Sequence, residues 1–185
     1  MEPAKDYPQR KNIRLQGYDY STPGYYFITI VTNQRAEMFG TVSNGRMIHN
    51  EAGMMVKGVL EKAVAYHRGI TMTNMAVMPN HLHCIIGISA DGDTGISGII
   101  RYFKSKTTVE YIRGVKEKGW KRFDGKLWQF RFYDHIIRNQ HSYDKINEYI
   151  LLNPERWDKD KLNAMCGDDA DDINSMIKEC ESRCI

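Results

Sequence analysis

The segment from Met78 to Ile88 (MPNHLHCIIGI) constrains the fold most, because a turn signal leads directly into a β-branched apolar run. The Met-Pro-Asn tripeptide predicts a turn, and the run from His81 to Ile88 predicts a strand. Side chains alternate between the two faces of a strand. His81 and His83 therefore share one face, and the opposite face carries the apolar residues Leu82, Cys84, Ile86 and Ile88.

The two histidines have two interpretations. Imidazoles two residues apart on a strand lie close enough to bind one cation. The alternative is a partly exposed strand on which the histidines have no chemical role. The strand pattern by itself leaves both open.

The remaining segments predict an α+β domain. Strands are expected at residues 25–32, 70–77 and 127–138, with a hairpin from Met38 to Ile48 around Ser43-Asn44-Gly45. Helices are expected from Glu51 to about His67, after an Asn50 cap, from about Ile96, and from a Ser142 cap to just before Pro154.

Without the hairpin and the last helix, this order is βαββαβ. That order predicts a ferredoxin-like (RRM-like) sandwich, in which two helices cover one face of an antiparallel sheet. The other face is expected to be free and to display the two histidines. The last helix is expected to dock on the sheet through the stripe that contains Ile146 and Ile150.

Composition predicts a cytoplasmic protein without a membrane span. No apolar run approaches the roughly 18 residues of a membrane helix, and the N-terminus lacks a signal-peptide core. The four cysteines, Cys84, Cys166, Cys180 and Cys184, are expected to be unpaired thiols.

The charge is unevenly distributed. From Asp158 onward the chain has eight acidic and four basic residues, a net charge of −4. Because the full chain carries +3, the residues before Asp158 carry a net charge of +7. We therefore expect a basic domain at residues 1–160 and an acidic C-terminal tail at 161–185.

A basic stretch between residues 101 and 122 predicts nucleic-acid binding. Its cations are interleaved with Tyr102, Tyr111 and Trp120, and single-stranded nucleic acids are bound by cations and flat rings together. A solvated helix face is the alternative. The candidate contacts, including one from the following strand, are Arg101, Lys104, Lys106, Arg113, Lys116, Lys121, Arg122 and Arg131.

Tyr149 and Asn153 lie one helical turn apart on the docking stripe of the last helix. Asn153 has a structural alternative as the residue that ends the helix before Pro154, and Tyr149 as a core aromatic. Considered with the histidines, they suggest a cation held by His81, His83 and Asn153 beside a tyrosine hydroxyl. Such a set supports covalent phosphoryl transfer.

These motifs resemble a known family. His-Leu-His within MPNHLHCIIGI is similar to the HUH motif of single-tyrosine transposases. The segments RKNIRLQGYDYSTPGYYFITIVTNQR, WQFRFYDHIIRN and YILLNPERWDKD resemble the REP-associated tyrosine transposases. The resemblance covers about residues 10–160.

The resemblance implies roles for four residues. The family's metal-binding histidines fall on His81 and His83, its nucleophile on Tyr149, and its third ligand on Asn153. It implies Mg²⁺ or Mn²⁺, a single-stranded DNA substrate that forms hairpins from imperfect palindromes, and a 5′-phosphotyrosine intermediate. A monomer or a homodimer fits this expectation. The alternative function is a non-catalytic single-strand-binding module with an RRM-like sheet.

Overall fold

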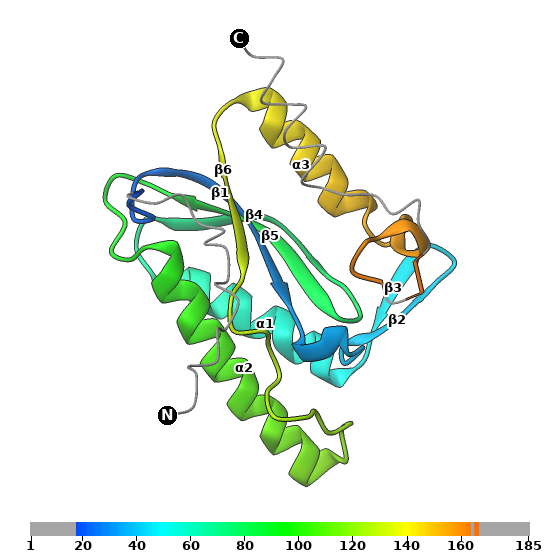
Figure 1. Ribbon diagram of the computed structural model, residues 1–185. Helices are drawn as coiled ribbons and strands as arrows, with labels where there is room; N and C mark the ends of the chain where they lie inside the picture. The colour runs from blue at the N-terminus through cyan, green and yellow to red at the C-terminus, as the bar shows by residue number, and fades with distance from the viewer. Residues whose placement is uncertain (1–17, 164, 167–185) are drawn as a thin grey trace, which may run out of the picture.

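The computed structural model describes residues 18–163, 165 and 166, and shows an antiparallel sheet with helices on both sides (Figure 1). The sheet order is β4-β5-β1-β6. Its strands are β1 (Gly24–Val31), β4 (Ile70–Val77), β5 (His81–Ile88) and β6 (Tyr133–Ile137), and its helices are α1 (Glu51–Tyr66), α2 (Ile96–Lys118) and α3 (Gln140–Leu152). The order confirms the ferredoxin-like α+β sandwich.

One face of the sheet packs against α1 and α2. Alternate residues of the two central strands point into this core: Tyr26, Ile28 and Ile30 from β1, and Leu82, Cys84, Ile86 and Ile88 from β5. All of these side chains are buried, so the predicted apolar face of the histidine strand is confirmed.

The other face of the sheet packs against α3. Ile146 and Ile150 of α3 contact Phe27 and Ile85 of the central strands. The predicted docking of the last helix through Ile146 and Ile150 is confirmed. The expectation of a free face was wrong, because this same helix covers the centre of that face. The histidines lie beneath this cover rather than at an open surface.

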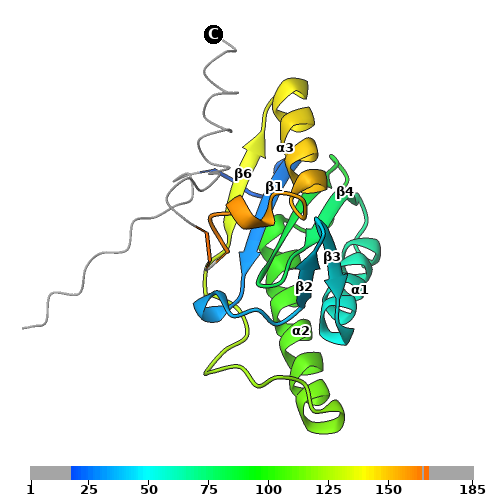
Figure 2. The same cartoon turned by 90° about the vertical axis from the view of Figure 1, so that its right-hand side faces the viewer.

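A hairpin and two short 3₁₀ helices complete the described chain. Strands β2 (Gly40–Ser43) and β3 (Arg46–His49) confirm the predicted hairpin. Asn44 and Gly45 have φ values of 49° and 68°, which only a few residue types adopt readily. The 3₁₀ helices are η1 (Asn33–Arg35) and η2 (Trp157–Lys159). Figure 2 shows the chain around η2 folding back from the end of α3 across the sheet.

The last strand is shorter than predicted. Residues 127–132 were expected to continue β6, but only an isolated bridge between Thr32 and Trp128 precedes Tyr133. The ammonium group of Lys104 donates hydrogen bonds to the carbonyl oxygens of Gln129, Phe130 and Arg131. These carbonyls point toward α2, which prevents a regular ladder with β1.

Several predictions lie outside the described residues. These include the N-terminal segment before residue 18, most of the acidic tail, Cys180 and Cys184. The boundary at residue 160 therefore stays a prediction. Within the described chain, Cys84 and Cys166 are free thiols, and no helix is long and apolar enough to cross a membrane.

The N-terminal cap of α3 differs from the prediction. Asn139, not Ser142, is the N-cap, and its side chain accepts a hydrogen bond of 2.7 Å from the Ser142 amide. The Ser142 hydroxyl is buried and has no hydrogen-bond partner among the described residues.

We predict opposite outcomes for alanine at the two positions. Asn139→Ala removes the cap and should lower the free energy of unfolding by about 1 kcal/mol. Ser142→Ala removes an unsatisfied hydroxyl and should leave stability unchanged or slightly higher. Urea denaturation of both variants measures this, and an equal loss in Ser142→Ala would contradict the assignment of the cap.

Candidate functional site

His81 and His83 form a buried pair beneath α3. Their exposed fractions are 0% and 1%, and their ring centroids lie 4.5 Å apart. The alternation of β5 places both rings on the α3 face while Leu82 points into the other core. The interpretation as a partly exposed strand is therefore wrong.

A hydrogen bond holds the Nδ1 atom of each ring. His81 Nδ1 lies 2.8 Å from Asn80 Oδ1, and His83 Nδ1 lies 2.8 Å from Thr29 Oγ1. Because the Asn80 oxygen only accepts, His81 donates from Nδ1 and keeps the lone pair on Nε2. A donated Nδ1–H with a free Nε2 is the usual arrangement of a metal-binding histidine.

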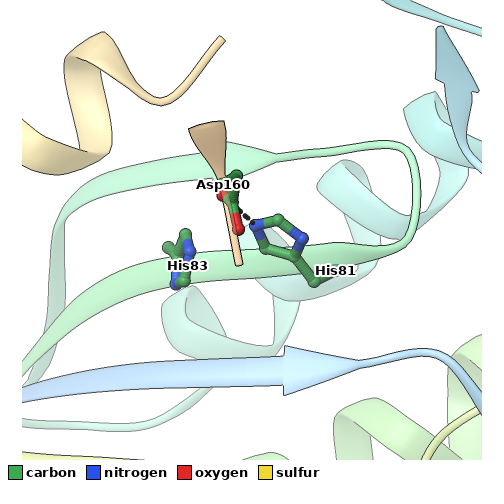
Figure 3. A group of neighbouring side chains, drawn as sticks. All are labelled: His81, His83 and Asp160. Carbon is green, nitrogen blue, oxygen red and sulfur yellow. Dashed lines mark ion pairs between the residues drawn. The ribbon is translucent and has the colours of Figure 1, made fainter. Parts of the chain in front are cut away.

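A carboxylate completes the cluster. Asp160, which directly follows η2, lies 3.6 Å from His81 Nε2 through Oδ2, and its side chain is almost fully buried (Figure 3). This distance is too long for a hydrogen bond but is close to the spacing of two ligands on one ion. Ligand atoms of His81, His83 and Asp160 all lie within 4.8 Å of one another.

Asn153 joins the same cluster at the end of α3. Its Nδ2 donates a hydrogen bond of 2.8 Å to Asp160 Oδ2. Its Oδ1 is buried and, like the Nε2 atoms of His81 and His83, has no hydrogen-bond partner among the described residues. The structure thus brings together the three predicted ligands, and adds Asp160.

Three buried acceptors of the cluster lack a hydrogen-bond donor among the described residues: His81 Nε2, His83 Nε2 and Asn153 Oδ1. Leaving such groups unpaired costs on the order of 1–3 kcal/mol each. The Asp160 carboxylate beside them accepts hydrogen bonds from the Asn153 side chain and the Leu162 amide. Either a proton or a cation could relieve this cost. Nitrogen and oxygen donors in this number fit a divalent cation.

The lowered pKa values of the two histidines disfavour a proton on either ring at neutral pH. Burial lowers the pKa of His81 to about 4, although the Asp160 carboxylate and the Asn153 side chain partly oppose this shift. Burial, together with the neighbouring His81, lowers the pKa of His83 well below its usual value. Both rings are therefore neutral and available as ligands at pH 7.

Tyr149 lies directly beside the cluster. Its ring packs edge-on against His83, with 5.3 Å between the centroids and an interplanar angle of 69°. Helix α3 positions it, because Asn74 of β4 donates hydrogen bonds to the carbonyl and side-chain oxygens of Asn147. The predicted nucleophile and the predicted ligands are thus neighbours within one chain.

Several hydrogen bonds fix the segment that carries Asp160. The Asn80 amide donates to the carbonyls of Arg35 and Leu162, and the Arg35 guanidinium donates to the carbonyl of Lys161. Asn80 therefore holds both His81 and the Asp160 segment. Trp157 adds a ring 5.9 Å from that of His81 and helps to close the cluster from water.

The predicted nucleic-acid contacts lie in two places. Arg101, Lys104, Lys106, Arg113 and Lys116 are on α2, on the opposite face of the sheet from the histidines. Lys121, Arg122 and Arg131 lie in the connection from α2 to β6. Glu110 forms ion pairs with Lys106 and Arg113, and Tyr111 is buried in the core. Nucleic-acid binding by these residues stays a prediction.

Three site residues were not predicted from the sequence. Asp160 was considered only in the charge count from Asp158 onward, Asn80 was assigned only to a turn, and Thr29 was assigned to a strand without a polar role. The WDKD segment shortly after the Asn-Pro end of α3 was the available signal for Asp160. No local signal indicated Thr29, because its role depends on the pairing of β1 with β5.

Comparison with known proteins identifies the family. The family model for transposases described as IS200 like matches residues 20–153, which include both histidines, Tyr149 and Asn153. The chain belongs to this family. Asp160 lies beyond the residues matched, so the IS200-like transposase model does not describe this part of the cluster.

Individual relatives agree with this membership. The chain is 34% identical over 166 residues to an uncharacterized protein of Haemophilus influenzae, covering 83% of this chain and 92% of that protein. It is 27% identical over 136 residues to a REP-associated tyrosine transposase of Escherichia coli K12, covering 73% and 68%.

A solved structure has the same fold. A REP-associated tyrosine transposase bound to a REP hairpin superposes with a TM-score of 0.55 at 22% identity, covering 78% of this chain and 74% of that one. The ferredoxin-like arrangement of this IS200-like transposase is therefore shared with a structurally characterised protein.

We predict that acid destabilises the metal-free protein through the buried histidines. The pKa of His81 is about 4 in the folded protein and about 6.5 in an unfolded chain, so the unfolded chain binds more protons between these values. The melting temperature in a chelator should therefore fall as the pH falls from 6.5 toward 4.

The histidine variants separate this effect from general acid denaturation. His83→Gln should make the decline shallower, because it removes one group that must stay neutral. His141→Gln, at an exposed position on α3, serves as the control and should keep the decline of the unmodified protein. Equal slopes in His83→Gln and the unmodified protein would contradict the interpretation.

Proposed function

We propose that this IS200-like transposase cleaves and rejoins single-stranded DNA through a covalent bond to Tyr149. The observation that carries the proposal is the contact of the Tyr149 ring with His83, at the edge of a buried cluster of metal-type donors. A nucleophile and a cation site in contact suit phosphoryl transfer. Membership in a transposase family supports the same chemistry.

His81, His83 and Asp160 are the proposed protein ligands of a divalent cation, with Asn153 Oδ1 as a further donor. Two nitrogen donors with two oxygen donors suit Mn²⁺ or Mg²⁺, which accept such mixed sets with water in the remaining positions. The ion supplies positive charge that polarises the scissile phosphate. Asn80 and Thr29 orient the two rings from behind by holding their Nδ1 atoms.

Tyr149 provides the attacking oxygen. Its Oη forms a bond to phosphorus while the bond from phosphorus to the 3′ oxygen breaks. The tyrosine loses its proton and the departing 3′ oxygen gains one, so no net proton is consumed. The phosphotyrosine bond preserves the energy of the broken bond, which allows a second 3′-hydroxyl to reverse the step and join a new strand.

The proposed substrate is single-stranded DNA that folds into hairpins from imperfect palindromes. The related solved transposase was bound to a REP hairpin, and the Escherichia coli relative is named for REP association. Helix α3 packs on the sheet of its own chain, so one chain holds both Tyr149 and the ligands. We propose that Tyr149 acts on DNA bound to the same chain, in a monomer or within a homodimer.

The function predicts a covalent protein–DNA adduct. Incubation with 5′- and 3′-labelled hairpin oligonucleotides and Mn²⁺ should yield a denaturation-resistant adduct that carries the DNA segment 3′ of the cut, and should release a free 3′-hydroxyl fragment. Tyr149→Phe should reduce the adduct at least a hundredfold, because the nucleophile is lost.

Tyr143→Phe is the matched control, since Tyr143 lies on the same helix six residues earlier. It should retain adduct formation. Hairpin DNA binding without any adduct, over a broad set of hairpins, would contradict catalysis and favour the single-strand-binding module. An adduct that persists in Tyr149→Phe would assign the nucleophile to another residue.

A further inference from the structure

Phe130 is unusually exposed for a large aromatic residue. Its side chain is 83% exposed, although alternation along the strand predicted at residues 127–138 would place it on one face with Trp128 and Phe132. Trp128 is buried and Phe132 packs against the core, so only the middle aromatic of the three points into solvent.

Two residues of α2 form hydrogen bonds with the turn around Phe130. Lys104 Nζ donates hydrogen bonds of 2.8, 3.3 and 3.0 Å to the carbonyls of Gln129, Phe130 and Arg131. One turn further along α2, the Thr107 hydroxyl accepts a hydrogen bond of 2.8 Å from the Trp128 indole. The turn is therefore fixed, and the outward position of Phe130 is not a consequence of a loose loop.

The sheet pairing places the backbone next to Phe130 two strands away from His81. The amide of Gln129 donates to the carbonyl of Val31, and Val31 pairs with His81 across the sheet. Neighbouring strands are about 4.8 Å apart, so the backbone next to Phe130 lies roughly 10 Å from that of His81. At this separation, the turn is within reach of a nucleotide next to a phosphate bound at the histidines.

The chemistry of the turn suits a nucleobase. Phe130 offers a flat ring without a hydrogen-bonding group, and such rings stack on any base. Exposed cations, Lys126 and Arg131, lie within four residues of it along the chain. Single exposed apolar side chains are common on proteins. Phe130 differs from such side chains because Lys104 binds three successive carbonyls of its turn, and this turn lies two strands away from His81.

We propose that Phe130 is a stacking platform for a base adjacent to the cleaved phosphate, and that Lys104 positions it. In this arrangement the ammonium of Lys104 donates hydrogen bonds to backbone carbonyls rather than binding DNA phosphates. The proposal rests on the proposed function, because its ligand is the single-stranded DNA that the site cleaves. It assigns Phe130 a role in binding and Lys104 a role that acts through Phe130.

The test is the dissociation constant of the full-length protein for a fluorescently labelled hairpin oligonucleotide with single-stranded flanks, measured by anisotropy with Tyr149→Phe as the common background. Phe130→Ala should weaken binding about tenfold or more, in the range of one lost stacked base. Phe130→Trp should restore it. Tyr66→Ala removes an equally exposed aromatic (86%) at the end of α1 and should have no effect.

Lys104→Met, which keeps the length of the side chain, separates the two roles of the lysine. If Lys104 acts through Phe130, the variant that combines Lys104→Met with Phe130→Ala should bind the oligonucleotide no more weakly than Phe130→Ala alone. The salt dependence of the dissociation constant should be the same in both variants. Additive losses with a reduced salt slope would overturn the positioning role.

The outcomes also separate this proposal from the proposed function. Normal binding by Phe130→Ala, in a protein that forms the Tyr149 adduct, would overturn the stacking platform and leave the function intact. Absence of hairpin binding in the Tyr149→Phe background and of adduct in the unmodified protein would overturn both.

Discussion

The site depends on the burial of hydrogen-bond acceptors against one another. Asn80 holds the Nδ1 atom of His81, and Thr29 that of His83, so both Nε2 atoms point toward Asp160 and Asn153 Oδ1. In a hydrophobic core this arrangement is unfavourable unless a positive charge lies between the groups. The low pKa of His81 means that a proton does not supply this charge at neutral pH. These features support the proposal that the cluster binds a cation.

The sheet brings this local arrangement together with the proposed nucleophile. The pairing of β1 with β5 places Thr29 behind His83, and α3 lies across the same face with Tyr149 against that ring. The segment after α3 returns over the sheet to add Asp160, and Asn80 holds that segment. Rigid elements and buried hydrogen bonds thus carry every proposed participant, which suits chemistry that requires aligned attack on phosphorus.

The sequence predicted the parts of the site that depend on local periodicity. Alternation along β5 was enough to place His81 and His83 on one face, and helical spacing was enough to pair Tyr149 with Asn153. Asp160 was not predicted, because its role depends on how the chain turns after Pro154, and no period describes that turn. The same limit explains the error at Phe130. The alternation of apolar residues around it predicted a strand. In the structure, Lys104 of α2 donates hydrogen bonds to the carbonyls of Gln129 and Arg131, which in a strand would accept from a neighbouring strand.

The most direct test of the account is the position of the cation. Crystals of the protein grown with Mn²⁺ should show one anomalous diffraction peak bounded by His81 Nε2, His83 Nε2 and an Asp160 carboxylate oxygen, beside the Tyr149 ring. A fully occupied Mn²⁺ site elsewhere, with these four side chains unchanged and no peak between them, would contradict the account.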